Sequence, residues 1–238
     1  MGLSTTCPAG AFRRAAFRRA ALAGALASAL APTLAPAATV LVVGDSISAA
    51  YGIDQDDGWV ALAEEALRED YPEIEFVNAS ISGDTTGGGL RRLPDALERF
   101  DPDVVVIELG GNDGLRAYPV ERMRDNLEAM VEAAEASGAE TLILGMMIPS
   151  NYGPAYTEAF GRAFAEAAEA TGSDLVPFFL EPIAEDRSAF QRDGIHPTAE
   201  AQPLLMEHAL PALRGVLEDV DADGDAVSGA AVDAESGG

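Results

Sequence analysis

The chain has 238 residues, of which 48% are hydrophobic and 23% charged, a composition typical of a globular protein with a substantial core. It carries 15 basic and 40 acidic residues, and all of the basic ones are arginine, so the net charge is −25. A field of this sign repels nucleic acid and anionic membrane surfaces, and neither is an expected partner.

The N-terminal 37 residues have the pattern of an export signal. Four arginines between positions 13 and 19 precede an Ala- and Leu-rich stretch at 20–31, and Ala35-Pro36-Ala37 has the form of a signal-peptidase site. The apolar run is shorter than the ~20 residues that span a bilayer. We expect cleavage after Ala37, a periplasmic or secreted protein and no stable membrane anchor. The paired arginines leave both the Sec and the twin-arginine routes open.

Loss of this signal changes the cysteine content and the charge. Cys7 is the only cysteine, so the mature chain would have no disulfide and no cysteine-based metal site. It would keep 11 basic residues against 40 acidic ones, a net charge of −29. Only seven of these acids lie in residues 218–238. An acidic surface without lysine suggests adaptation to high salt, that is, a halophilic protein.

Residues 38–217 have the alternating pattern of a single α/β domain. Short runs rich in Val, Ile, Leu or Phe predict five buried parallel strands, at 40–45, 74–79, 103–109, 141–148 and 174–179. Helical spacing lies at 58–69, 119–137, 156–171 and about 198–217. The order predicts a five-stranded parallel sheet in a three-layer α/β/α sandwich, with a flavodoxin-like strand order. Residues 218–238 are expected to form a disordered acidic tail.

Three loops that follow the first three predicted strands carry polar residues. Ser46 ends the first strand, "NASISGDT" (78–85) follows the second and "LGGND" (109–113) follows the third. A flavodoxin-like order places the first strand between the other two, so these loops meet at one edge of the sheet. Gly83 offers a backbone N–H with no Cβ in the way, and Asn112 offers uncharged N–H donors. With the N–H of Ser46, they make three donors for an oxyanion.

A histidine and an aspartate complete a candidate catalytic set. His196 lies in the loop "RDGIHPT", three residues after Asp193, close enough for a tight turn to bring the carboxylate to the imidazole. Alone, this pair is equally consistent with a helix-entry device. Together with Ser46 it supplies the parts of a nucleophilic triad, which is defined by geometry rather than chain order. The second histidine, His208, lies within the last predicted helix and is interpreted as a partly exposed structural residue.

Other chemistries have weaker support. Two histidines twelve residues apart make a poor zinc site, and "GDTTGGGLRR" (83–92) lacks the ending of a phosphate-binding loop. "GDSIS" does not match the G-x-S-x-G nucleophile turn. An EF-hand-like start at Asp219 has Ala230 in place of the required Glu. We therefore expect neither a metal nor a cofactor.

These motifs resemble the SGNH hydrolases of the GDSL esterase/lipase family, in particular the exported bacterial arylesterases, acyl-CoA thioesterases I and lysophospholipases L1. The resemblance runs from "VVGDSISAAYGI" through "VNASISGDTTGGGLRRLPDAL", "VVIELGGNDGLRA" and "IPSNYGPAY" to "DGIHPTAEAQP". It implies a metal-independent serine esterase with Ser46 as nucleophile, His196 as base and then acid, and Asp193 as its orienter. The N–H groups of Ser46 and Gly83 and the Asn112 side chain would form the oxyanion hole. Ile47, Met147 and Ser150 depart from the family pattern, which affects substrate preference rather than the reaction.

The expected function is an exported serine esterase that acts through an acyl-enzyme intermediate on aryl and alkyl esters, acyl thioesters and lysophospholipids. Its partners are these small molecules, and the protein is expected to be a monomer. Asn151 and Tyr152 are expected to border the acyl site. Two alternatives stay open: a carbohydrate O-acetyl esterase with the same mechanism, and a non-catalytic periplasmic binding domain.

Overall fold

The computed structural model describes Met1 and residues 38–235, with residues 223–235 described for their backbone only. The predicted signal, including Cys7 and the cleavage position, therefore lies outside the described residues. Within the described ranges, no helix is both long enough and apolar enough to cross a membrane.

A five-stranded parallel sheet forms the centre of the fold, as predicted. Its strands are β1 (Thr39–Gly44), β2 (Glu75–Asn78), β3 (Val104–Glu108), β4 (Glu140–Leu144) and β5 (Asp174–Val176). The order is β2-β1-β3-β4-β5, which is the flavodoxin-like order, and every neighbouring pair is parallel. The loops after β1, β2 and β3 consequently leave the same edge of the sheet.

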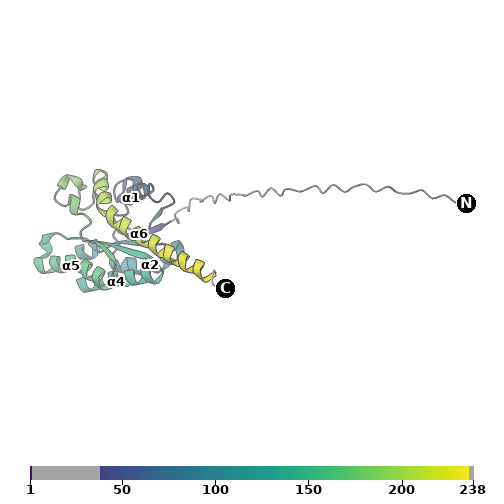
Figure 1. The fold of residues 1–238 in the computed structure, drawn as a ribbon. Coiled ribbons are helices and arrows are strands. Elements are labelled where there is room, and N and C mark those ends of the chain that lie inside the picture. The colour runs from purple at the N-terminus through teal and green to yellow at the C-terminus, as the bar shows by residue number, and fades with distance from the viewer. Residues whose placement is uncertain (2–37, 236–238) are drawn as a thin grey trace. The chain divides into compact units, whose positions relative to one another are not determined.

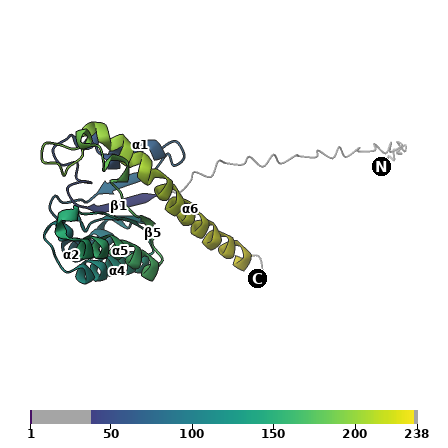
Figure 2. The same cartoon turned by 90° about the vertical axis from the view of Figure 1, so that its left-hand side faces the viewer.

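Helices cover both faces of this sheet, which confirms the predicted three layers. One face carries α1 (Trp59–Leu67) and α6 (Gln202–Glu235), and the other carries α2 (Thr86–Phe100), α4 (Val120–Ala136) and α5 (Pro154–Thr171) (Figure 1, Figure 2). A short helix, α3 (Gly111–Leu115), directly follows β3. The 3-10 turns are Gln55–Asp57, Ser150–Tyr152, Glu181–Ile183, Arg187–Ala189 and Ala199–Ala201.

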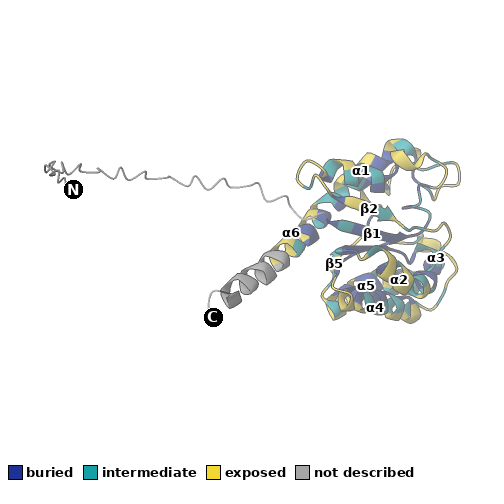
Figure 3. Cartoon of the chain, turned by 90° about the vertical axis from the view of Figure 1, so that its right-hand side faces the viewer, coloured by how far each residue is buried: buried dark blue, intermediate teal, exposed yellow. Residues whose placement is uncertain are grey.

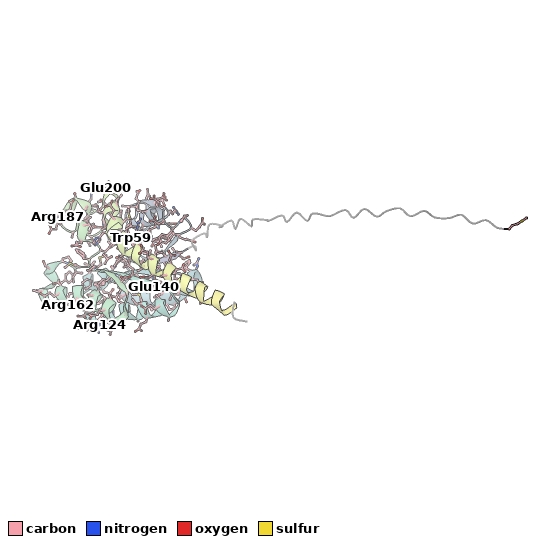
Figure 4. The ribbon with its side chains drawn as sticks, in the orientation of Figure 1. Trp59, Arg124, Glu140, Arg162, Arg187 and Glu200 are labelled. Carbon is pink, nitrogen blue, oxygen red and sulfur yellow. The ribbon has the colours of Figure 1, made fainter. Side chains whose placement is uncertain are left out.

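The core lies between the layers, where the apolar stripes of the helices meet the sheet (Figure 3). The predicted stripe of α4, which includes Met123 and Leu127, is buried. On the opposite face Trp59, labelled in Figure 4, is fully buried and packs edge-on against Phe179 with ring centroids 5.1 Å apart. Burial of one such large side chain contributes about 1.5–3 kcal/mol.

Helix α2 was not predicted, because its sequence contains Gly87-Gly88-Gly89 and Pro94, all poor helix formers. Tertiary packing requires two of these glycines. A Cβ at Gly89 would overlap the Leu109 side chain, and one at Gly88 would overlap the carboxylate of Asp84. The helix therefore gives up intrinsic propensity for a close approach to the sheet and to the preceding loop.

The end of the last helix also differs from the prediction. Helical spacing indicated an end near residue 217, followed by a disordered tail, whereas α6 runs to Glu235. Its first turns are anchored in the core by Leu205, Ala209 and Leu213. Nucleation is the costly step of helix formation, so an anchored helix extends at little further cost.

A buried glutamate ends the central strand β3. Glu108 is 0% exposed and pairs in register with Gly44 of β1, next to the loop that carries Ser46. Its Oε2 accepts hydrogen bonds from the Asp45 N–H at 3.3 Å, the Ser48 N–H at 3.2 Å and the Ser48 hydroxyl at 2.7 Å. Burial raises the pKa of Glu108 well above its ordinary value, and the nearby Asp45 carboxyl raises it further.

Replacement of Glu108 by Gln should flatten the pH dependence of stability. A carboxyl with a raised folded-state pKa contributes stability fully below its unfolded pKa of about 4.3, and this is lost as the pH rises through the folded pKa. Gln keeps an acceptor oxygen for the three donors but cannot ionise. Between mildly acidic and mildly alkaline pH, the unfolding free energy of Glu108→Gln should fall less than that of the wild type. The difference is at most about 1.4 kcal/mol per pH unit in urea titrations.

The matched control is Glu75→Gln, at an exposed position of β2. Its unfolding free energy should run parallel to that of the wild type over the same pH series. A parallel course for Glu108→Gln as well would contradict the assignment of a raised pKa to this carboxyl.

Candidate active site

Three side chains predicted as a triad form a continuous hydrogen-bonded chain. The Ser46 hydroxyl lies 2.9 Å from Nε2 of His196, and Nδ1 of the same ring lies 2.8 Å from Oδ2 of Asp193. The Asp193 carboxylate accepts the Nδ1–H, which leaves Nε2 as an acceptor for the serine proton. Ser46 and His196 are 150 residues apart in the chain, and the fold brings them together.

The loop around His196 holds the ring and its carboxylate partner in place. The other oxygen of Asp193 accepts the backbone N–H groups of Ile195 at 2.9 Å and His196 at 3.1 Å. The imidazole bond and these two N–H bonds lower the pKa of Asp193 to about 2. The ring of Tyr51 packs against the imidazole at a centroid distance of 4.4 Å. Asp193 is therefore a charged acceptor that fixes one tautomer and one orientation of His196.

Ser46 lies in a turn whose neighbouring amides are occupied. The Asp45 and Ser48 N–H groups donate to Glu108, and the Ile47 N–H donates to Oδ1 of Asp45 at 3.1 Å. The Ser48 hydroxyl also accepts the indole N–H of Trp59 at 3.1 Å, so the turn is tied to α1. Among the described residues, the N–H of Ser46 itself has no acceptor.

Two neighbouring segments each supply a further N–H group that has no acceptor among the described residues. Gly83, after β2, has φ +80°, a conformation that favours glycine, and its N–H has no acceptor within the described part of the chain. Asn112, in α3, uses one amide hydrogen in a 2.8 Å bond to Oδ2 of Asp45, which leaves its second hydrogen available. The three predicted oxyanion donors therefore all keep an N–H that no described residue accepts.

Asp45 orients the Asn112 side chain through a hydrogen bond. The carboxyl group is buried, and burial raises its pKa, while the bonds from the Ile47 N–H and from Asn112 lower it. The bond from Asn112 to Asp45 fixes the orientation of the amide, so that its second hydrogen points away from Asp45.

An apolar cavity of about 460 Å³ opens beside these groups. Ser46, Asn112 and His196 lie on its lining with Asp45. The remaining wall is mainly apolar, with Ile47, Leu115, Met146, Met147, Ile148, Pro149, Phe178, Leu180, Ala184, Phe190 and Ile195. A cavity of this size and lining, with a few convergent polar groups, is typical of a site for a small apolar ligand.

Three other singled-out residues lie away from this cavity wall. Asn151 and Tyr152 do not line the cavity, and the Tyr152 hydroxyl instead donates to the Leu115 carbonyl at 2.9 Å. His208 lies on α6, where its Nε2 is 3.1 Å from the Phe178 carbonyl. In the described ranges, no three His, Cys, Asp or Glu side chains are grouped as metal ligands would be.

The sequence interpretation missed Asp45 and Glu108 as parts of the site. The position of Asp45 could have indicated a role, because an acidic residue next to a candidate nucleophile affects the electrostatics around it. Glu108 gave a weaker indication: it is the only charged residue in an otherwise apolar strand. A charge in such a run is costly unless it is paired or neutralised, which is itself a reason to look for a role.

Two curated relatives are hydrolases of ester or thioester bonds. Esterase TesA of Pseudomonas aeruginosa is 50% identical over 181 residues, which cover 76% of this chain and 90% of that protein. The thioesterase 1/protease 1/lysophospholipase L1 of Escherichia coli K12 is 39% identical over 171 residues, which cover 72% of this chain and 81% of that protein.

Solved structures and a family model agree with these relatives. The structure of the psychrotrophic esterase EstA from Pseudoalteromonas, inhibited by monoethylphosphonate, overlays with a TM-score of 0.72 at 42% identity, covering 76% of this chain and 98% of that one. The model of the GDSL-like lipase/acylhydrolase family matches residues 42–203, which span β1 to the start of α6 and include every member of the triad. The chain therefore belongs to the GDSL-like lipase/acylhydrolase family, the SGNH hydrolases, whose members here are hydrolases of ester bonds.

Proposed function

We propose that this protein is a serine esterase in which Ser46 is acylated, with His196 as the proton carrier and Asp193 as its orienting carboxylate. One observation carries the proposal. The hydrogen-bonded chain from Asp193 through His196 to Ser46 ends at an apolar cavity that Ser46 and Asn112 line. Among the described residues, the N–H groups of Ser46 and Gly83 and one amide hydrogen of Asn112 have no acceptor. Nucleophile, base and oxyanion donors are the parts that acyl transfer requires.

In the first half-reaction, Ser46 Oγ attacks the carbonyl carbon while His196 Nε2 accepts the hydroxyl proton. The carbonyl oxygen becomes an oxyanion, which accepts the N–H groups of Ser46 and Gly83 and the free amide hydrogen of Asn112. These donors are held before the reaction starts, so they lower the barrier without reorganisation. The bond to the leaving group then breaks, C–O in an ester or C–S in a thioester, and His196 donates the proton to the departing alkoxide or thiolate.

In the second half-reaction, His196 accepts a proton from water as that water attacks the acyl-enzyme carbonyl. The same three donors bind the second oxyanion, and its collapse breaks the bond to Ser46 Oγ, which takes back the proton from His196. Asp193 remains a carboxylate throughout, consistent with its pKa of about 2.

The substrates are aryl and alkyl esters, acyl thioesters and lysophospholipids, with the acyl chain along the cavity wall. Met146, Met147 and Phe178 line this wall, while Phe179 points into the core. The Pseudomonas relative is named an esterase, and the E. coli relative is named a thioesterase, protease and lysophospholipase. Tyr152 supports the site through its bond to Leu115, a lining residue, rather than by direct contact.

The N-terminal sequence supports export to the periplasm or beyond, with cleavage after Ala37 and residues 38–217 as the hydrolase domain. No nucleic acid, cofactor or metal takes part in the proposed reaction, and the enzyme acts as a monomer. The carbohydrate esterase alternative is disfavoured by the apolar wall, because an acetylated sugar would need polar partners there.

A fluorophosphonate probe should label Ser46, and Ser46→Ala should abolish turnover while the protein stays folded. The reason is that the acyl group has no other attachment point in the site. Labelling is read by peptide mass spectrometry, and folding by far-UV circular dichroism. A Ser46→Ala variant that keeps most of its activity would refute the assignment.

The substrate class is tested with a panel run beside Ser46→Ala. It contains aryl esters of increasing acyl length, acyl-CoA thioesters, lysophospholipids and acetylated sugars. The apolar wall predicts that kcat/KM rises with acyl length over the first members of the aryl ester series. Preference for the acetylated sugars would favour the carbohydrate alternative, and turnover of none of them would favour a binding domain.

Activity should fall on acidification, because a protonated His196 cannot accept the serine proton. Asp193→Asn should lower kcat by roughly 10³–10⁴, since the amide no longer selects the reactive tautomer. The matched control is His208→Ala, whose pH profile should superimpose on that of the wild type. A changed profile in His208→Ala, with Asp193→Asn near full activity, would exchange the roles of the two histidines.

The acidic surface supports adaptation to high salt, and the melting temperature should rise from low salt to molar NaCl. Repulsion among the surface acids opposes the compact state, and it is screened beyond ~10 Å at 0.1 M salt but beyond only ~3 Å at 1 M. A truncation that removes residues 223–238 keeps the buried Leu217 and the partly buried Val220, and it should keep most of the rise. A flat or falling melting temperature in the full chain would reject the halophilic interpretation.

A further inference from the structure

One arginine joins the two loops that carry the backbone donors of the site. Arg92 lies in the second turn of α2, and its guanidinium donates to three acceptors on separate parts of the chain. These are Oδ2 of Asp84 at 2.8 Å, the Ala79 carbonyl at 2.6 Å and the Gly44 carbonyl at 3.2 Å. The side chains of Arg92 and Asp84 are only 21% and 14% exposed, so the pair is largely shielded from solvent.

Each of these acceptors is close in sequence to an oxyanion donor. Gly44 precedes the Ser46 turn by two residues, and Asp84 directly follows Gly83. Ala79 begins the loop that leads from β2 to Gly83. One planar group is therefore bonded to the end of β1, just before Ser46, and to the loop that carries Gly83, on both sides of that residue.

Backbone hydrogen bonds alone do not fix the Gly83 turn. The Ala79 and Ile81 N–H groups donate to the Val42 and Gly44 carbonyls, which ties the start of the loop to β1. Beyond Ile81, the Asp84 N–H returns to the Ile81 carbonyl, within the loop itself. Among the described residues, Gly83 has one further contact, a 3.0 Å bond from Arg116 to its carbonyl on the exposed side.

The sequence of α2 makes room for this arrangement. The Asp84 carboxylate occupies the space that a Cβ at Gly88 would take, and its Oδ1 accepts the Thr85 N–H at 2.9 Å. Asp84 is thus fixed just before α2, the helix that also carries Arg92. The poor helix former Gly88 has a role here that its propensity does not explain.

We propose that Arg92 is a positioning residue of the oxyanion hole, which holds the Gly83 N–H in register with the Ser46 N–H. This rests on the proposed function. The guanidinium does not touch substrate. It keeps two donors preorganised, and a displacement of either one by a fraction of an ångström weakens transition-state binding more than substrate binding. Lysine cannot replace it, because an ammonium lacks the planar fork that meets three acceptors at once.

The test compares Arg92→Lys and Arg92→Ala with the wild type in steady-state hydrolysis of a short aryl ester. We expect kcat to fall roughly 10- to 100-fold in both variants, less than for loss of an entire donor, with KM changed little. The phosphonylation rate of Ser46 should fall in proportion, because the probe also develops an oxyanion. Arg91→Ala is the matched control: Arg91 is the exposed neighbour on the same helix, and its kcat should equal that of the wild type.

A rescue experiment separates positioning from a general loss of structure. Millimolar guanidinium, far below denaturing concentrations, should restore a measurable part of kcat to Arg92→Ala, and methylammonium should not. Two outcomes would overturn the proposal. One is wild-type kcat in both Arg92 variants; the other is a fall in kcat that guanidinium does not reverse and that follows the fraction of unfolded protein. Activity of the wild type together with inactivity of Ser46→Ala shows, independently, whether the proposed function holds.

Discussion

The site depends on one buried carboxyl group. Glu108 ends β3 inside the protein, and a single oxygen of its side chain accepts two N–H groups and one hydroxyl of the Asp45–Ser48 turn. A buried carboxyl without hydrogen-bond partners would cost several kcal/mol, and the three hydrogen bonds from the turn offset this cost. The neighbouring amides are occupied in this way, whereas the N–H of Ser46 has no acceptor among the described residues and its hydroxyl meets His196. The Ser48 hydroxyl also accepts the indole N–H of Trp59, which links the turn to α1 on one face of the sheet.

Three carboxyl groups of the site have different environments and different tasks. Asp193 is partly exposed and accepts three N–H groups, so it keeps its charge and supports an imidazolium. Asp45 and Glu108 are buried near each other, and burial raises the pKa of each, while the Asp45 carboxyl raises that of Glu108 further. The pKa of Asp193 is therefore shifted down and those of Asp45 and Glu108 are shifted up, each by its own surroundings. Separation of pKa values by environment is a general way to give similar groups distinct roles.

Much of the fold and of the triad could be predicted from sequence, for physical reasons. Buried parallel strands need continuous apolar runs, so the strand order and the loop edge followed from local pattern. Few residue types can act as nucleophile, orienter and base, so the sequence could single out Ser46, Asp193 and His196, which the structure joins by hydrogen bonds. Their catalytic roles are part of the proposal. The contacts of Arg92 and Glu108 could not be predicted, because they depend on strand register and helix packing and not on residue types that mark a reaction. Helix α2 was missed because Gly88 and Gly89 are poor helix formers that are present for close packing. Helix α6 continues past its predicted end because its first turns are anchored in the core, which outweighs the weak helical signal of the later residues.

The strongly acidic surface and the site rely mainly on different kinds of interaction. At the site, the decisive contacts are short hydrogen bonds between backbone amides, neutral amides and shielded groups, which salt screens little. The acids elsewhere lie mostly on exposed helix faces, where Arg68 and Arg124 pair with several neighbours at once. Exposed pairs of this kind contribute little individually, so most of the acid excess is left to solvent and counterions. Arg92 differs from these surface arginines because its three acceptors include two backbone carbonyls, which carry no net charge and cannot be exchanged for a counterion. An enzyme built in this way can change its surface charge for its surroundings without changing the hydrogen bonds that hold the loops around Ser46 and Gly83.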